Sequence, residues 1–360
     1  MDYKIVYLED LVPDSIIEEI EEQGLKVEHV KPLDNFEDTL IQIKNIGADL
    51  ILMDFRLYAG VSKFNAPPFA QFFRSQVVEK GESLPIALIS SETEIHSYYR
   101  DYTSFDLFDF AVEKGIFIEK IKKYSNLMKE LIDSYKDLKT KKYSEDALIK
   151  DLLDVPEELQ LRLDRRLLEL LVMDKYQNDA FMMSGLLLSS LVKPIGILIG
   201  PDVLAARLGV DVDSQDWDKL LKEIDEFKYT GLYSKTYERW WAQGIDIWWS
   251  KNFPTETSLR RLTADERHKV ISERFNLNLN SIDQPKFASS SRYWTICSGN
   301  FKQPLDPIDG FEIIKDTDVS PWLENKYYSF EYLIDNVDQK ILKKIKEQDR
   351  NRLSQKMRGK

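Results

Sequence analysis

Four apolar segments in the first third of the chain each end in, or are followed by, a side chain that can do ionic chemistry. These side chains are Glu9 and Asp10, Asp54, Ser90 and Lys114. Carboxylates that lie together repel one another unless a cation sits between them. Oxygen ligands suit magnesium better than zinc, and an ammonium with a hydroxyl can bind the oxygens of a transferred phosphoryl group. The residue types therefore suit a magnesium-assisted phosphoryl-transfer site.

The pattern of residues 4–112 predicts a fold that brings these side chains together. The expected strands are 4–8, 26–30, 50–54, 84–90 and 108–112, and the expected helices are 13–22, 35–46, 67–79 and 92–99. Strands that alternate with helices form a parallel sheet with helices on both faces. The carboxyl ends of such strands meet at one edge, where open α/β sheets bind their ligands. We therefore expect the five side chains at one edge of the sheet.

On these residues, the segment 3–118 resembles the receiver domain of two-component response regulators. The resemblance implies an α/β fold, with a five-stranded, doubly wound parallel sheet in the flavodoxin-like order 2-1-3-4-5. It also implies that Asp54 is the phosphoacceptor, which takes a phosphoryl group from a partner histidine kinase or a phosphotransfer protein.

The same resemblance implies roles for the side chains around Asp54. Magnesium would be bound by Glu9, Asp10 and Asp54, together with the backbone carbonyl of Arg56. Two further residues would stabilise the bound phosphoryl group, namely the switch hydroxyl Ser90 and the lysine Lys114.

Three departures from the receiver pattern concern the signal that follows phosphorylation. The loop 58–68 after the acceptor strand is several residues longer than usual, and Gly115 replaces a proline after Lys114. The usual place of the switch aromatic holds Ala111, so Phe110, one position away, is the candidate switch residue. These changes affect the expected readout more than the phosphorylation chemistry.

A connecting helix is expected next, because apolar residues over 121–138 follow a 3-4 spacing. They are Ile121, Tyr124, Met128, Leu131, Tyr135 and Leu138. This heptad pattern is typical either of a parallel homodimer or of a helix that packs on its own chain. The expected division of the chain is a receiver-like domain at 1–118, a connecting helix and linker at 119–144, and an output or scaffold domain at 145–360.

The region 145–360 is expected to be mostly α-helical, with a small irregular or β part. The segment 202–210 resembles part of a helix-turn-helix, but the following segment 211–218 is acidic where a recognition helix is basic, so we expect no DNA binding. The region has no catalytic or metal-binding motif. We therefore expect no enzymatic activity beyond the phosphoryl chemistry of the receiver-like domain.

Four tryptophans fall close together in this region, on what the pattern predicts to be one helix from Tyr237 onward. They are Trp240, Trp241, Trp248 and Trp249. Aromatic side chains dominate both protein cores and protein interfaces. The four residues are therefore either core or a docking surface for a protein partner.

The charge and cysteine content restrict the environment of the protein. The net charge is −12, and residues 1–120 contain 23 acidic but only 11 basic residues, which disfavours contact with nucleic acid and anionic membranes. The most apolar segment is too short to span a bilayer. A single cysteine, Cys297, and the lack of a signal-peptide pattern favour a cytoplasmic location.

These observations favour a phosphorelay signalling protein whose helical C-terminal region transmits the signal by protein–protein contact. Two alternatives stay open. The receiver-like domain could be a phosphate sink that competes for phosphoryl groups, or an interaction module that is never phosphorylated.

Overall fold

The computed structural model describes residues 3–59, 62–77, 82–90, 107–301, 303–315 and 320–358. By its internal contacts the chain forms two compact units. The first unit is Met1–Leu152 with Arg165–Leu188, and the second is Leu153–Asp164 with Ser189–Lys360.

The first unit contains a five-stranded parallel sheet. The strands are β1 (Lys4–Leu8), β2 (Lys26–Val30), β3 (Leu50–Asp54), β6 (Ile86–Ser90) and β7 (Phe110–Glu113). Their order is β2-β1-β3-β6-β7, and every neighbouring pair is parallel. This is the flavodoxin-like order, so the predicted fold of the N-terminal region is confirmed.

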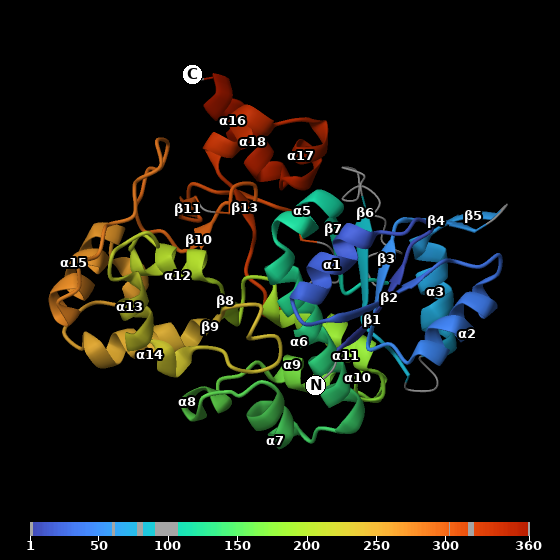
Figure 1. The fold of residues 1–360 in the computed structure, drawn as a ribbon. Coiled ribbons are helices and arrows are strands. Elements are labelled where there is room, and N and C mark those ends of the chain that lie inside the picture. Colours follow the sequence, from blue (N-terminus) through green and yellow to red (C-terminus); the bar gives the residue numbers. More distant parts are fainter. Residues whose placement is uncertain are drawn as a thin grey trace. The chain divides into compact units, whose positions relative to one another are not determined.

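Helices cover both faces of this sheet. They are α1 (Asp14–Glu22), α2 (Phe36–Ile46), α3 (Ala66–Val77), α5 (Lys114–Glu119) and α6 (Ile121–Thr140). Figure 1 shows α2 and α3 on one side of the sheet and α1, α5 and α6 on the other. Strands with both faces covered carry apolar residues in succession, which explains the unbroken apolar segments of the sequence. The predicted helix 92–99 lies outside the described residues.

Local sequence sets the ends of α2. The Asn35 side chain caps the helix by accepting a hydrogen bond of 2.7 Å from the Asp38 backbone N–H. Gly47 ends it in a left-handed conformation with φ of 70°, which glycine adopts without steric cost. The apolar face between these ends packs Leu40 and Ile43 into the core beside the sheet.

The long loop after β3 forms a β-hairpin. Its strands are β4 (Arg56–Ala59) and β5 (Ser62–Asn65), which pair antiparallel. The Ala66 backbone N–H donates to the Phe55 carbonyl at 2.8 Å and closes the base of the hairpin where α3 begins. The extra residues of this segment are therefore part of regular structure.

The apolar stripe of α6 is buried inside the first unit. Met128, Leu131, Tyr135 and Leu138 are all at most 5% exposed. The helix packs against α1, α5 and α11 (Ala180–Leu187), which matches packing on its own chain. While this packing holds, the stripe is not available to a second copy of the chain.

Residues beyond the expected domain boundary at 144 also belong to the first unit. They form α7 (Glu145–Ala147), the π-helical turn η2 (Leu148–Leu152), α9 (Arg165–Leu171), α10 (Asp174–Gln177) and α11. The boundaries of the compact units thus differ from the expected 1–118, 119–144 and 145–360. The difference arises because α11 lies against α6.

A buried ion pair between α3 and the sheet also contacts α11, one of these added helices. Arg74 of α3 lies 3.2 Å from Asp109, which directly precedes β7, and both side chains are at most 6% exposed. Asp109 also accepts hydrogen bonds from the Tyr135 hydroxyl at 2.6 Å and from the Ile86 backbone N–H at 2.8 Å. The Arg74 guanidinium lies 3.6 Å from the ring centroid of Phe181 in α11.

The second unit is mostly helical and contains small two-stranded sheets, as predicted for the C-terminal region. Its helices are α8 (Glu157–Gln160), α12 (Pro201–Leu208), α13 (Trp217–Glu223), α14 (Ala242–Asn252), α15 (Ala264–Phe275), α16 (Phe330–Asn336), α17 (Gln339–Lys344), α18 (Glu347–Arg358), the 3-10 turns η4 (Asp225–Phe227) and η5 (Leu259–Arg261), and the π-helical turn η3 (Leu188–Val192), which starts at the unit boundary. Its strands pair as β8 (Leu198–Ile199) with β9 (Trp240–Trp241), β10 (Thr295–Ile296) with β11 (Pro304–Leu305), and β12 (Phe311–Glu312) with β13 (Tyr327–Tyr328).

The four clustered tryptophans form part of the core of this unit. Trp240, Trp241, Trp248 and Trp249 are at most 2% exposed. The first two form strand β9, so the predicted single helix from Tyr237 is wrong. The docking-surface interpretation is also wrong, because neighbouring aromatic rings and β8 cover these side chains.

The helix of the segment that resembles a helix-turn-helix is α12, whose residues Val203–Leu208 are all buried. No described helix is both long and apolar enough to cross a membrane.

The Arg74–Asp109 pair predicts a large effect on stability. We expect Asp109→Ala to lower the free energy of unfolding by about 3–5 kcal/mol, because it leaves a buried guanidinium without its carboxylate. Urea denaturation measures the loss. Asp137→Ala on the exposed side of α6 is the matched control and should change stability by less than about 0.5 kcal/mol. A loss below about 1 kcal/mol for Asp109→Ala would contradict the assigned role.

Candidate functional site

The predicted site residues lie at the ends of neighbouring strands. Glu9 directly follows β1, Asp54 is the last residue of β3, and Ser90 is the last residue of β6. Lys114 directly follows β7 and begins α5. Since all five strands run parallel, these residues lie at one edge of the sheet.

Lys114 lies between the two buried carboxylates. Its Nζ is 2.7 Å from Asp54 Oδ1 and 2.7 Å from Glu9 Oε2. The side chains of Glu9 and Asp54 are 5% and 10% exposed, whereas that of Lys114 is 24% exposed. The ammonium is thus the most accessible member of a three-residue ionic cluster, which we call the Lys114 cluster (Glu9, Asp54 and Lys114).

Neighbouring groups fix the orientation of both carboxylates. Asp54 Oδ2 accepts a hydrogen bond of 3.1 Å from the Arg56 backbone N–H. Glu9 Oε2 accepts a second hydrogen bond from the Tyr7 hydroxyl at 3.4 Å, and its backbone carbonyl lies 2.8 Å from His29 Nε2. These contacts leave the carboxylates little freedom to turn away from Lys114.

Burial and neighbouring charges shift the pKa values in the cluster. The pKa of Glu9 is raised to about 7: burial is the main cause, the charge of Asp54 and a hydrogen bond with Asp10 add to it, and Lys114 partly opposes the shift. Burial lowers the pKa of Lys114, but its bonds to Asp54 and Glu9 outweigh this effect and raise it overall. Burial also raises the pKa of Tyr7 above its usual value. The charge of Glu9 is therefore coupled to those of Asp54 and Lys114.

The other predicted site residues are Asp10, Ser90 and Arg56. Asp10 is half-buried and interacts with Glu9, and Ser90 is buried at the same edge. Arg56 lies in β4 opposite Asn65, and its carbonyl as a metal ligand stays a prediction. Among the described residues, no three His, Cys, Asp or Glu side chains are arranged to hold a metal ion.

Phe110 lies at the start of β7, away from Lys114. Its buried ring stacks on Tyr124 of α6 at 5.7 Å, and Tyr124 stacks on Phe117 of α5 at 5.5 Å. The ring therefore joins three elements of the unit. Its role as a switch residue stays a prediction.

Two contacts of Glu9 were not predicted from the sequence. Tyr7 lies two residues before Glu9, so both side chains point to the same face of the strand, and this periodicity could have indicated the contact. His29 is the partner of Tyr7 in the β1–β2 register. That pairing between strands is set by the fold, so it could not be found from local sequence.

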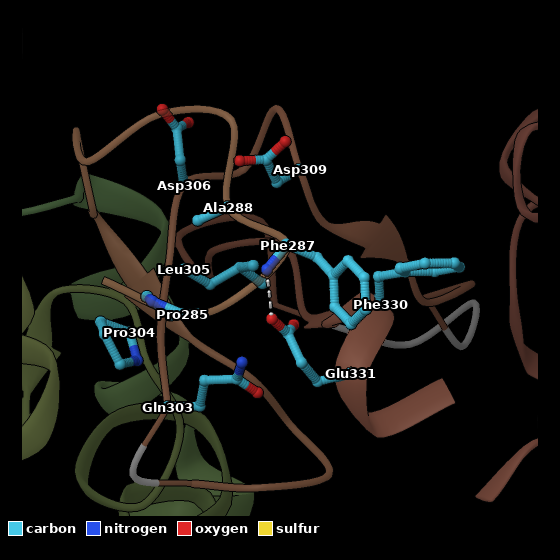
Figure 2. Close-up of a pocket in the computed structure, with 10 residues that line it drawn as sticks. All are labelled: Pro285, Phe287, Ala288, Gln303, Pro304, Leu305, Asp306, Asp309, Phe330 and Glu331. Atoms are coloured by element: carbon cyan, nitrogen blue, oxygen red, sulfur yellow. Dashed lines mark hydrogen bonds between the residues drawn. The ribbon is translucent and has the colours of Figure 1, made fainter. Parts of the chain in front are cut away.

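A second group of acids, in the other unit, surrounds a small pocket (Figure 2). The pocket volume is about 10 Å³, which is room for about one water molecule. Asp309 accepts hydrogen bonds from the Ser289 backbone N–H and hydroxyl at 2.8 and 2.6 Å, and Glu331 accepts one from the Phe287 backbone N–H at 2.8 Å. These carboxylates fix a loop and are not a reactive site.

The solved structures that resemble this chain include signal receiver domains. The receiver domain of a modulated diguanylate cyclase from Desulfovibrio desulfuricans G20 is 19% identical and covers 38% of this chain and 98% of its own, with a TM-score of 0.29. The chemotaxis protein CheY4 of Vibrio cholerae is 15% identical over 36% of this chain and 99% of its own, with a TM-score of 0.28. The receiver domain of a putative LuxO repressor protein from Vibrio parahaemolyticus is 12% identical over 39% of this chain and 99% of its own, with a TM-score of 0.30.

These neighbours are of the class that the N-terminal segment was found to resemble. At such identities the similarity concerns the fold alone. No protein-family model matches the sequence, and no curated protein does.

The raised pKa of Glu9 predicts a pH-dependent stability. Below pH 4.5 this carboxyl is protonated in both the folded and the unfolded chain, so it has no effect. Between pH 4.5 and about 7 the unfolded chain loses the proton while the folded chain keeps it, so the folded state loses stability as the pH rises. We expect Glu9→Gln to raise the free energy of unfolding above pH 7, by roughly 1–3 kcal/mol.

Urea denaturation at pH 4.5 and pH 8, with EDTA present to remove divalent cations, measures this effect. Glu18→Gln on the exposed face of α1 is the control and should have the stability of the wild type at both pH values. The predicted shift is contradicted if Glu9→Gln is as stable as the wild type at pH 8.

Proposed function

We propose that the first unit is a phosphorylation-dependent receiver of a two-component pathway, with Asp54 as the phosphoacceptor. The donor would be a partner histidine kinase or a phosphotransfer protein. The main support is the Lys114 cluster, because it places a buried carboxylate and an ammonium 2.7 Å apart at the ligand-binding edge of the sheet. The remainder of the chain would transmit the signal by protein–protein contact, without a catalytic activity of its own.

The proposed transfer uses groups that are already in position. A carboxylate oxygen of Asp54 attacks the phosphorus of a phosphohistidine, the P–N bond breaks, and the imidazole leaves with the bonding electrons. The product is an acyl phosphate on Asp54. Lys114 Nζ, now bound to Asp54 Oδ1, can move to a phosphoryl oxygen and stabilise its charge. Ser90, at the end of the next strand, would donate a hydrogen bond to the same group.

The residues at this edge fit a magnesium ion in their chemistry. Glu9, Asp10 and Asp54 supply only oxygen atoms. Burial is the main cause of the raised pKa of Glu9 and the charge of Asp54 adds to it, and a divalent cation would offset this repulsion. These three residues, with the carbonyl of Arg56, would hold the ion. When bound, magnesium would neutralise part of the charge of the transferred phosphoryl group. Because Lys114 Nζ lies between Glu9 and Asp54, it would have to move outward to make room.

The first step of the signal would be the release of Lys114 from Glu9. Phosphorylation adds nearly two negative charges, which compete with Glu9 for the ammonium. Lys114 is the first residue of α5, and α5 packs against α6. The stack of Phe110, Tyr124 and Phe117 joins β7, α6 and α5. We therefore propose α5 and α6 as the elements that respond.

One observation favours the alternative of a module that is never phosphorylated. Lys114 already bridges the two buried carboxylates, and the described acids form no ready-made metal cluster. The phosphate-sink alternative shares the chemistry of Asp54 and differs only in lacking an output. The first of the following two experiments tests for phosphorylation, and the second tests for magnesium binding.

Phosphorylation of Asp54 can be tested directly. We expect incubation with acetyl phosphate and MgCl₂ to add one phosphoryl group to the wild type, as measured by intact mass spectrometry, and none to Asp54→Asn. Asp34→Asn, an exposed acid outside the sheet, is the matched control and should be modified like the wild type. An unmodified wild-type protein under these conditions would leave only the unphosphorylated module.

Magnesium binding can be tested without any phosphodonor. A ligand that binds only the folded state adds about 2.7 kcal/mol of stability when its concentration is a hundred times Kd. We expect MgCl₂ at pH 7.5 to raise the urea midpoint of the wild type above that in NaCl of equal ionic strength. Asp54→Asn should lose most of this gain, and an equal gain in Asp54→Asn would contradict the assigned ligands.

A further inference from the structure

The second unit contains a cavity with an unusual excess of positive charge. Its volume is about 540 Å³, within the usual range for small-ligand sites. Four cationic residues line it, namely Lys193, Arg239, Lys326 and Lys344, whereas Asp202 is the one acid among its described lining residues. The four come from separate parts of the chain: two precede β8 and β9, one precedes β13, and one ends α17. The fold thus gathers these charges around one space.

Arg239 and the N-terminus of α12 meet at the wall of this cavity. The Arg239 guanidinium donates to the carbonyl oxygens of Val192 at 2.6 Å and Glu238 at 2.8 Å, which fixes its position. A Cβ at Gly200, the N-cap of α12, would lie only 2.9 Å from Arg239 Nη1. Only glycine at position 200 therefore lets the guanidinium approach the helix so closely.

This arrangement suits an anion. The N-terminus of a helix carries partial positive charge and favours negative groups. Here a guanidinium lies beside it, no side chain caps α12, and Asp202 is the acid in its first turn. Burial lowers the pKa of Arg239, and the charges of Tyr237, Asp202 and Glu238 partly oppose this shift. A phosphate group would add negative charge beside the four cations and accept hydrogen bonds from the backbone.

The rest of the cavity wall is apolar and aromatic. Tyr328 is nearly buried, and Ile195, Ile296 and Ile313 lie beside it in the lining. Phe301, also in the lining, is 66% exposed, which is unusual for so large an apolar side chain. A ligand for this cavity would therefore combine an anionic end with a flat, largely apolar part.

We propose that this cavity binds a nucleoside phosphate. The phosphate groups would lie at Arg239 and the N-terminus of α12, with Lys326 and Lys344 around them. The base would lie against Tyr328 and Phe301. This site is separate from the Lys114 cluster and does not depend on phosphorylation of Asp54.

Isothermal titration calorimetry of the full chain with ADP and GDP, in low salt without divalent cations, tests the proposal. We expect saturable binding of at least one of the two. Binding should weaken as salt is added, because screening reduces the attraction between the phosphates and the cations. Adenosine and guanosine should bind at least tenfold more weakly, as should inorganic phosphate. Asp54→Asn should bind like the wild type.

Variants localise the binding. Gly200→Ala adds a Cβ that displaces the Arg239 guanidinium, and Lys326→Ala with Lys344→Ala removes two exposed cations. We expect each variant to fold, as checked by circular dichroism, and to lose affinity about tenfold or more. Lys269→Ala, on the exposed face of α15, is the matched control and should bind normally.

Three results would overturn the proposal. They are no binding of ADP or GDP, equal affinity for the nucleosides or for inorganic phosphate, and unchanged affinity in folded Gly200→Ala and Lys326→Ala/Lys344→Ala.

Discussion

The contact of one ammonium with two buried carboxylates organises the carboxyl ends of the strands in the first unit. Glu9 and Asp54 come from adjacent strands and would repel each other without Lys114 between them. The pKa of Glu9 is raised to about 7 even with Lys114 in place, mainly because the carboxyl is buried and in part because of the charge of Asp54. A cation that binds at these strand ends would reduce the repulsion between the carboxylates. The position of Lys114 depends in turn on the charge of its neighbours. Since Lys114 begins α5, a change in that charge bears directly on a helix of the fold.

A different ionic contact lies at the amino ends of the strands, opposite the Lys114 cluster. Asp109, just before β7, binds Arg74 of α3 and the hydroxyl of Tyr135 in α6. This second contact is nearly fully buried and joins the sheet to α3 and α6. Arg74 also lies 3.6 Å from the ring centroid of Phe181 in α11, a helix beyond residue 144. The sheet thus has a partly accessible charge cluster at the carboxyl ends of its strands and a buried ion pair at their amino ends. The buried Arg74–Asp109 pair would keep its end of the sheet rigid. Of the two contacts, only the Lys114 cluster is accessible enough to respond to a ligand.

The strand order and the placement of the candidate site residues at the carboxyl ends of the strands could be predicted from the sequence because both follow from local patterns. Apolar segments that end in Asp54 and Ser90 are contiguous in the chain, and the parallel topology then places their ends together. Contacts between distant residues could not be predicted in this way. The Arg74–Asp109 pair depends on how α3 lies on the sheet, and the four cations of the nucleotide-sized cavity come from segments far apart in the chain. The tryptophans were ambiguous for another reason, since large aromatic side chains serve equally in cores and interfaces, and only their burial decides.

The central claim is that Lys114 moves from the carboxylates of the sheet to a phosphoryl group on Asp54. A crystal structure of the protein with magnesium and beryllofluoride, a stable analogue of the phosphoryl group, tests this claim most directly. The account predicts beryllium bound to an Asp54 carboxylate oxygen, magnesium beside Glu9 and Asp10, and Lys114 Nζ within hydrogen-bond distance of a fluorine and released from Glu9. A structure in which Asp54 carries no beryllofluoride and Lys114 still bridges Glu9 and Asp54 would contradict it.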